Sequence, residues 1–158
     1  MTFNPNQIMN YQSIYTVSPD EQIVSTTLQV VSGSEITYQP AINSDYVVYE
    51  ISFTSDHESP DTTVRSTYYL ESGSLGGSFS EVEGCINNHG GASSSPKDIK
   101  SLTYVVPSWI GYKNLRLSVD AYDNSKQAKL HNTYHWEGSI SSKKNSVRLE
   151  VFSIRNFE

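Results

Sequence analysis

The stretch Asp45-Tyr46-Val47-Val48-Tyr49-Glu50-Ile51-Ser52-Phe53 decides the fold class. Its alternate positions Val47, Tyr49, Ile51 and Phe53 are all apolar or aromatic, whereas the positions between them become polar toward the end. Successive side chains of a strand point to opposite faces, so this pattern predicts a strand with one buried face. β-branched and aromatic residues dominate the stretch and suit a half-buried pleated surface. Such a strand needs a second sheet to cover it.

Other stretches of the chain show the same alternation, with turn residues between them about every ten positions. The predicted strands are 22–31, 35–38, 45–53, 62–71, 79–82, 100–106, 114–122, 128–136 and 146–151. No stretch has a convincing helical period. We expect an all-β fold, an antiparallel β-sandwich of about eight or nine strands with jelly-roll topology. An immunoglobulin-like sandwich stays open as an alternative, although this chain lacks its cysteine pair.

The chain divides into an N-terminal arm, residues 1–21, and a single domain, residues 22–158. The arm is polar with scattered aromatics, Phe3, Tyr11 and Tyr15, and shows no persistent period. It is therefore predicted to be irregular. Exposed aromatic rings reduce solubility unless they are covered, so we expect the arm to pack on its own domain or on a neighbouring chain.

Residues 72–98 form the longest stretch predicted to be irregular, with six glycines and a Ser93-Ser94-Ser95 run. Long ordered loops often carry function, so this loop is a candidate contact region. It also holds Cys85, the one cysteine of the chain. Cys85 cannot form an intrachain disulfide and is not part of the CxxC motif or the cluster of Cys and His that a zinc site needs, so we expect it to be inert.

Charge and hydropathy exclude several classes of partner. The net charge is −6 and the pI is near 5.1, which argues against nucleic acid because phosphate binding depends on Lys and Arg. No apolar run approaches the ~20 residues that span a bilayer. The N-terminus has neither the basic start nor the apolar centre of a signal peptide, so we expect synthesis inside the cell.

The chain offers no motif for catalysis, for a cofactor or for a metal, and we expect no enzymatic activity. His131 and His135 are four residues apart, but in a strand their Cα atoms would lie about 13 Å apart, too far for one ion. They are expected to face solvent or an interface. The acidic pairs Asp20-Glu21 and Glu81-x-Glu83 are expected to be solvated. A β-sandwich hydrolase would need two carboxylates that converge on a cleft.

Several aromatic residues are candidates for binding instead. Tyr46, Tyr69 and Tyr122 lie on the parity opposite to the apolar faces, so they suit burial between subunits or stand as isolated surface aromatics. Trp109 and Tyr112, together with Trp136, could form a platform that stacks on sugar rings. The alternative is that these large aromatic residues fill the core at the ends of the sandwich.

Four stretches in this order resemble small virion domains of marine phages and large algal viruses. They are 35–40 (EITYQP), 47–53 (VVYEISF), 115–122 (LRLSVDAY) and 129–138 (KLHNTYHWEG). In that family a Tyr-x-Pro precedes a Val-x-Tyr-Glu-x-x-Phe strand, and a Lys-Leu-His strand ends in Trp, an acidic residue and Gly. The resemblance covers roughly residues 34–154. It departs from the family after 138, where this chain is rich in Ser and Lys rather than Pro.

The resemblance implies a jelly-roll sandwich similar to trimeric C1q or tumour-necrosis-factor heads. The implied role is non-enzymatic, as a fibre head, decoration protein or minor capsid component made in the host cytoplasm and located in the virion. The implied partners are other virion proteins and copies of this chain, with a trimer favoured; no catalytic residue or cofactor is implied. The alternative function is a carbohydrate- or host-receptor-binding module, with the site near Trp109, Tyr112 and loop 72–98 and a host surface glycan as ligand.

Overall fold

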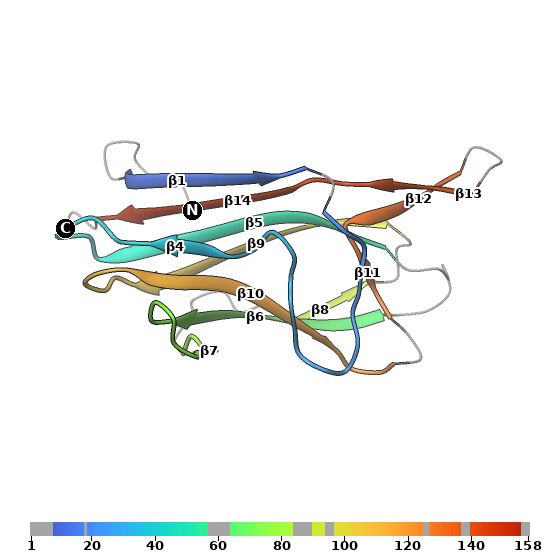
Figure 1. Ribbon diagram of the computed structural model, residues 1–158, viewed down its shortest axis with the longest axis horizontal. Coiled ribbons are helices and arrows are strands. Elements are labelled where there is room, and N and C mark those ends of the chain that lie inside the picture. The colour runs from blue at the N-terminus through green and yellow to red at the C-terminus, as the bar shows by residue number, and fades with distance from the viewer. Residues whose placement is uncertain are drawn as a thin grey trace.

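The computed structural model describes residues 8–17, 19–56, 64–83, 90–93, 97–124, 127–136 and 140–155. For residues 64, 90–93, 97–98, 132–136 and 140–144 the description is of the backbone. Figure 1 shows strands running along the long axis of the molecule in two layers, and the described residues contain no helix. The two main sheets are antiparallel, which confirms the predicted all-β antiparallel sandwich.

Sheet A contains six strands. They are β1 (Ile8–Thr16), β2 (Gln22–Ile23), β5 (Tyr46–Asp56), β9 (Lys97–Pro107), β11 (Lys129–Leu130) and β14 (Val147–Ile154). β1 pairs with β14, β14 with β5, and β5 with β9, while β11 joins the far end of β5 and β2 joins β11. This order places β5 at the centre of sheet A.

Sheet B also contains six strands, and a separate hairpin stands beside the two sheets. The strands of sheet B are β3 (Gln29–Val30), β4 (Ile36–Tyr38), β6 (Val64–Gly73), β7 (Phe79–Glu81), β8 (Gly90–Ser93) and β10 (Lys113–Ala121). β10 pairs with β6 on one side and with β3 and β4 on the other, and β6 pairs with β7 and β8. The hairpin is β12 (Asn132–Trp136) with β13 (Ile140–Lys144).

The predicted alternation of β5 is confirmed. Val47, Tyr49, Ile51 and Phe53 are all buried and belong to the main core between the sheets. The same rule holds in the strands that face or flank β5. The inward residues predicted from parity and found buried are Ser66, Tyr68, Leu70, Leu102, Tyr104, Val106, Leu115, Leu117, Val119, Ala121, Val147, Leu149 and Val151.

Four tyrosines, Tyr38, Tyr49, Tyr68 and Tyr104, are among the largest fully buried side chains. A buried hydroxyl needs a hydrogen-bond partner, and the sandwich supplies backbone acceptors. Tyr49 donates to the Ser34 carbonyl at 2.6 Å and Tyr104 donates to the Tyr68 carbonyl at 3.2 Å. Burial raises the pKa of Tyr49 well above its ordinary value. Much of the high tyrosine content therefore serves the core.

The prediction of an irregular arm is wrong for Ile8–Thr16. This segment is β1, which pairs with β14 from Ile8↔Ile154 to Thr16↔Val147. The register shifts between Met9 and Gln12, and Asn10 has a φ of 48°. This bulge interrupts the two-residue period, which explains why alternation was not visible in the sequence. The segment packs on its own domain, one of the two arrangements expected for it.

The prediction of one strand over 22–31 is also wrong. β2 pairs with β11 in sheet A, whereas β3 pairs with β10 in sheet B, so the chain crosses between sheets in this stretch. Val24 is buried and donates its N–H to the Ala128 carbonyl at 2.9 Å, while Leu28 is exposed. The apparent alternation of Val24, Leu28 and Val30 therefore does not mark one face of one strand.

Two further boundaries differ from the prediction. The predicted strand 128–136 is interrupted at His131, whose φ is 66°, so it divides into β11 and β12. In the stretch predicted to be a long loop, β7 forms as expected, but Gly90–Ser93 is an additional strand, β8, and β9 starts at Lys97. Cys85 lies outside the described residues. Split and additional strands raise the number from about nine in the prediction to fourteen among the described residues.

Candidate functional site

The outer face of sheet A carries a second apolar cluster, separate from the core. Val48, Val105, Phe152 and Ile154 are each 6% exposed or less, and Tyr46 packs against them. Register explains the cluster, because Phe152 is paired with Val48 and Val48 with Val105 across three neighbouring strands. Cross-strand apolar residues on one face pack directly on one another. On the outer side of this sheet these side chains therefore form a small second core, which the chain itself already covers.

β1 extends this cluster with aromatic residues that face solvent. The ring of Tyr11 stacks on Phe152 with a centroid distance of 6.3 Å and an interplanar angle of 29°. Ile8 is paired with Ile154, and Tyr15 is paired with Arg148. On β14, Arg148 has the same parity as Glu150 and Phe152, so Tyr15 points to the outer side of sheet A as well. Tyr15 is 66% exposed. We name this surface the aromatic outer face. Its residues are Ile8, Tyr11, Tyr15, Tyr46, Val48, Val105, Phe152 and Ile154.

A charged network holds Tyr11 in place over Phe152. The Tyr11 hydroxyl donates to the Glu150 carboxylate, which also accepts a hydrogen bond from Arg148 Nη2 at 2.6 Å. The Tyr11 hydrogen bond, followed by the Arg148 contacts, lowers the pKa of Glu150. The carboxylate therefore remains charged at neutral pH. The exposed ring of Tyr11 is pre-positioned rather than free, which reduces the entropy lost when a partner covers it.

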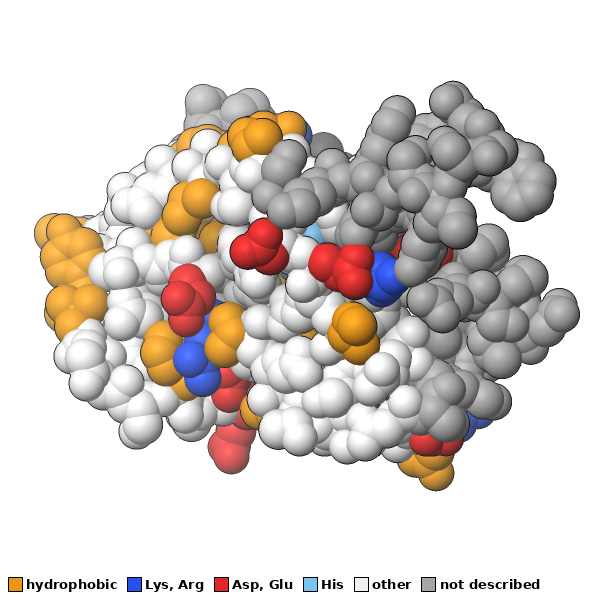
Figure 2. All heavy atoms as spheres, turned by 45° about the vertical axis from the view of Figure 1, so that its right-hand side comes forward, with side chains coloured by type: hydrophobic (Ala, Val, Ile, Leu, Met, Phe, Trp, Pro, Cys, Tyr) orange, Lys and Arg blue, Asp and Glu red, His pale blue; other side chains and the backbone are white. Residues whose placement is uncertain are grey.

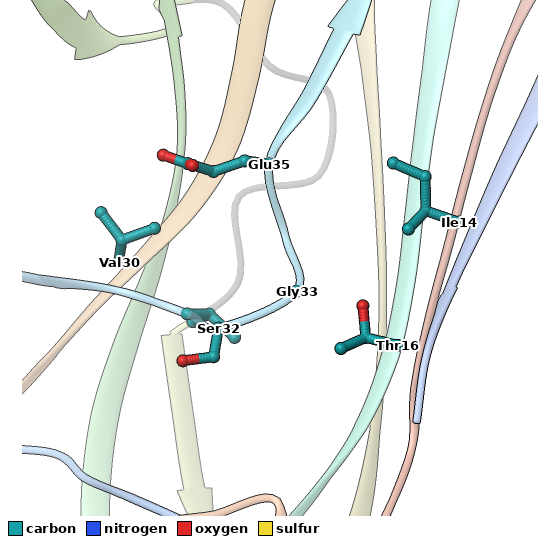
Figure 3. Close-up of a pocket in the computed structure, with 7 residues that line it drawn as sticks. Ile14, Thr16, Val30, Ser32, Gly33 and Glu35 are labelled. Atoms are coloured by element: carbon teal, nitrogen blue, oxygen red, sulfur yellow. The ribbon is translucent and has the colours of Figure 1, made fainter. Parts of the chain in front are cut away.

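A groove lies beside the aromatic outer face, where the edge of sheet A approaches sheet B. Figure 3 shows Ile14 and Thr16 of β1 on one wall, and Val30, Ser32 and Glu35 on the other. Its volume is about 440 Å³. Gly33 also lines the groove, and its backbone lies close to Thr16 on the opposite wall. A Cβ at position 33 would lie only 3.1 Å from Thr16 Oγ1.

The groove wall formed by residues 30–32 is already capped by a side chain. Gln22 Nε2 donates to the Val30 carbonyl at 2.6 Å, and Gln22 Oε1 accepts from the Ser32 N–H at 3.1 Å. The amide of Gln22 thus takes the place that a neighbouring strand would occupy. This capping protects the edge of sheet B against pairing with another chain.

The remaining tyrosine candidates lie on sheet B, away from the aromatic outer face. Tyr69 is paired with Ser118 and is half-buried, and Tyr122 follows the end of β10 and is 81% exposed. Between them the outer side of sheet B is mainly a polar network. Glu71 accepts hydrogen bonds from Arg116 Nε at 2.7 Å and from Ser118 Oγ. The structure does not bring Tyr69 and Tyr122 together with Tyr11, Tyr15 and Tyr46.

Trp109 and Tyr112 lie in the loop that connects β9 and β10. Trp109 is half-buried against the core, with its ring edge-on to Tyr38 at 6.3 Å. The ammonium group of Lys113 lies 5.3 Å from the Trp109 ring centroid. Packing against the core matches the core role considered for Trp109. Tyr112 is exposed. The side chain of Trp136 and all of Phe3 lie outside the described residues.

His131 is not on the surface, so the expectation that it faces solvent or an interface is wrong. It is fully buried, and its ring is edge-on to Phe53 at 5.9 Å. Its N–H donates to the Thr54 carbonyl, and its carbonyl accepts from the Asn145 N–H, but neither ring nitrogen has a hydrogen-bond partner. Burial lowers its pKa from 6.5 to about 4. The left-handed backbone at this residue turns the side chain inward against the predicted parity.

In the described part of the chain, no group of three or more His, Cys, Asp and Glu side chains could hold a metal ion. Asp20, Glu21, Glu81 and Glu83 are exposed, as expected for the acidic pairs. Over the residues that the structure describes, there is no helix long and apolar enough to span a bilayer.

Parity predicted Tyr46 as an outward residue but missed the rest of the apolar cluster beneath it. The signal was present in the sequence as unbroken apolar pairs, Val47-Val48 and Val105-Val106. A strand buried on one face alternates, whereas consecutive apolar residues are typical of strands covered on both faces. Phe152 next to Val151 follows the same rule.

No family model matches the chain, and no curated protein is similar to it in sequence.

Proposed function

We propose that this protein is a non-enzymatic structural component of a virus particle. In this proposal it assembles with copies of itself and with other virion proteins through the aromatic outer face. It is made in the host cytoplasm and ends in the virion as a fibre head, decoration protein or minor capsid component. The observation that carries the proposal is the exposure of Ile8, Tyr11 and Tyr15 on β1, beside the buried cluster on the outer side of sheet A.

The strand order supports a jelly roll as the finer topology. Sheet A contains the order β1-β14-β5-β9, and sheet B contains β4-β10-β6-β7. Along the chain these eight strands alternate between the sheets, except that β6 and β7 are neighbours in one sheet. Two four-stranded sheets connected in this way correspond to the paired Greek keys of a jelly roll, a fold common in capsid proteins.

The physical character of the aromatic outer face supports association rather than catalysis. Tyrosine, phenylalanine and arginine are enriched in protein interfaces. Charged groups also lie on this face, because Glu150 is paired with Glu50 and binds both Arg148 and Tyr11. Tyr11 and Tyr15 combine a large apolar area with a polar tip, and Tyr11 is already oriented by Glu150. Burial of one such exposed ring in a well-packed contact contributes about 2 kcal/mol, enough to make it a hot spot.

Position at the sheet edge also suits assembly. Among the described residues β1 pairs with no strand other than β14, and apart from the contacts of Asn10 with Tyr38 and Gln39 no further hydrogen bond is described on its other side. A closed symmetric oligomer buries the same patch on every copy. We favour a trimer, the state that the sequence resemblance to virion domains implies.

Sedimentation velocity on the purified full chain tests the proposal. We expect an oligomer whose mass falls toward that of the 17.7 kDa chain when Tyr15→Asp places a charge on the aromatic outer face. Tyr122→Asp is the matched control, since Tyr122 is even more exposed but lies beyond sheet B. A monomer at every concentration, or equal loss of mass in both variants, would count against assembly through this face.

A further inference from the structure

The end of the sandwich opposite the β12–β13 hairpin presents apolar side chains on three loops. The loops are 39–45, 74–78 and 108–112, and the pairings Tyr46↔Pro107, Lys113↔Tyr38 and Asn114↔Gly73 place them at one end. Figure 1 shows this end on the left, and in Figure 2 hydrophobic side chains stand out along the left margin. We name the exposed residues the loop tip: Ile42, Leu75, Ile110 and Tyr112.

The exposure of the loop tip is unusually complete. Ile110 is fully exposed and Ile42 is 87% exposed. Single exposed apolar residues are common on protein surfaces, but four on converging loops form a patch. Ile110 and Tyr112 share loop 108–112, whereas Ile42 and Leu75 each lie on a loop of their own.

Hydrogen bonds fix the loops that carry the two isoleucines. Ser44 Oγ and Ser108 Oγ lie 2.6 Å apart and join the two loops, and the Ser108 N–H donates to the Asp45 carbonyl at 2.9 Å. Gly111 has a φ of 86°, which allows the tight turn after Ile110. The isoleucines are thus held away from the core, so they cannot escape water by collapsing onto the domain.

The charge at this end differs from that of the whole protein. Lys113 and Arg155 outnumber Asp45 among the described residues next to the loop tip, although the chain as a whole carries −6. The ammonium group of Lys113 lies over the half-buried ring of Trp109, 5.3 Å from its centroid. Trp109 is next to Ile110 in the loop, and Lys113 follows Tyr112 at the start of β10.

We propose that the loop tip inserts into the interfacial layer of a lipid bilayer that contains anionic lipids. Aliphatic side chains would enter the acyl boundary, Tyr112 would sit at headgroup depth, and Lys113 and Arg155 would contact lipid phosphates. Trp and Tyr are enriched at this depth, and Lys extends from it toward anionic headgroups. This function goes beyond assembly through the aromatic outer face and is independent of it.

The area of the loop tip favours a bilayer over a protein partner. Four side chains offer on the order of 400 Å² of apolar surface, about half of what one partner contributes to a stable protein interface. A bilayer deforms around exposed side chains, whereas a protein partner would need a matching surface. Reversible membrane binding needs only modest apolar insertion when it is assisted by basic residues.

Flotation of the full chain with vesicles tests the proposal. The probes are vesicles of phosphatidylcholine alone and of phosphatidylcholine mixed with phosphatidylglycerol. We expect the wild type to float with the mixed vesicles and more weakly with the neutral ones. Ile110→Asp should weaken binding about tenfold or more, because one aliphatic side chain no longer leaves water. The matched control is Ile99→Asp, since Ile99 is a 73% exposed isoleucine on β9, away from the loop tip.

Thermal melts of both variants establish that each one is folded, and Ile42→Asp gives a second, independent loop-tip variant. The proposal is overturned if the wild type stays with neither kind of vesicle, or if Ile99→Asp loses as much binding as Ile110→Asp. It is also overturned if a glycan array or a second protein captures the tip while vesicles do not. Failure of the sedimentation test would leave the vesicle result unaffected, so the two proposals can be separated.

Discussion

His131 should make the stability of the domain depend on pH in the mildly acidic range. Burial lowers its pKa from 6.5 to about 4, so between these values the unfolded chain binds a proton that the folded protein does not. Stability therefore rises with pH across this window and is lost as pH falls through it. The difference corresponds to about 3 kcal/mol when pH falls below 4. This is a large part of the ~5–15 kcal/mol that stabilises an ordinary domain.

The substitution His131→Leu removes the titrating group and keeps most of the volume. Neither imidazole nitrogen has a hydrogen-bond partner, so no hydrogen bond is lost. The left-handed φ of 66° remains, and His tolerates it somewhat better than Leu. We therefore expect stability at pH 7 to change by about 1 kcal/mol or less, whereas the loss between pH 6.5 and 4 should shrink by about 3 kcal/mol.

Urea unfolding monitored by fluorescence at several pH values measures this difference. Carboxylates such as Glu150 add their own acid dependence, so the informative quantity is wild type minus variant at each pH. His57→Leu serves as the control, because the sequence predicts that His57 lies in a loop. Parallel curves for wild type and His131→Leu would refute the inference that a buried neutral imidazole controls acid stability.

Two further predictions concern contacts that fix the architecture. Gly33→Ala should lower the free energy of unfolding in urea by about 2 kcal/mol, because its φ is +82° and a Cβ would press on the β1 edge. Gly76→Ala is the control, with a φ of +72° and open space around it, and should cost about 1 kcal/mol. Equal losses in the two variants would show that the contact of the added Cβ with β1 has no cost. Glu71→Ala should cost about 2–4 kcal/mol of stability, because it leaves Arg116 without its buried partner. Glu35→Ala removes the exposed partner of Arg116, which lies 3.8 Å away, and should cost about 0.5 kcal/mol or less. Thermal melts that coincide for the two variants would refute this ranking.

The main sheets could be predicted from the sequence because their inward residues obey a strict period of two. β5, β6, β9, β10 and β14 each alternate, and their predicted inward side chains are buried. Local irregularities could not be predicted. The bulge near Asn10 and the left-handed His131 each shift the parity, and an alternation rule has no means of detecting a backbone φ.

The candidate surface was predictable only in part. Outward parity identified Tyr46, and the aromatic content of the first residues identified Tyr11 and Tyr15. Their convergence depends on β1 pairing with β14, a contact between opposite ends of the chain. No local pattern encodes a pairing over that separation. The loop tip depends in the same way on which loops the topology brings to one end.

Hydroxyl-radical footprinting of the assembled protein tests the central claim most directly, because it measures the solvent exposure of Tyr15 and Tyr122 in one sample. Tyr15 is 66% exposed and Tyr122 is 81% exposed in the single chain, so an unassociated protein should label both. Assembly through the aromatic outer face predicts that Tyr15 becomes protected as concentration rises, while Tyr122 keeps its reactivity. Equal labelling of both at every concentration, or protection of Tyr122 alone, would contradict the account.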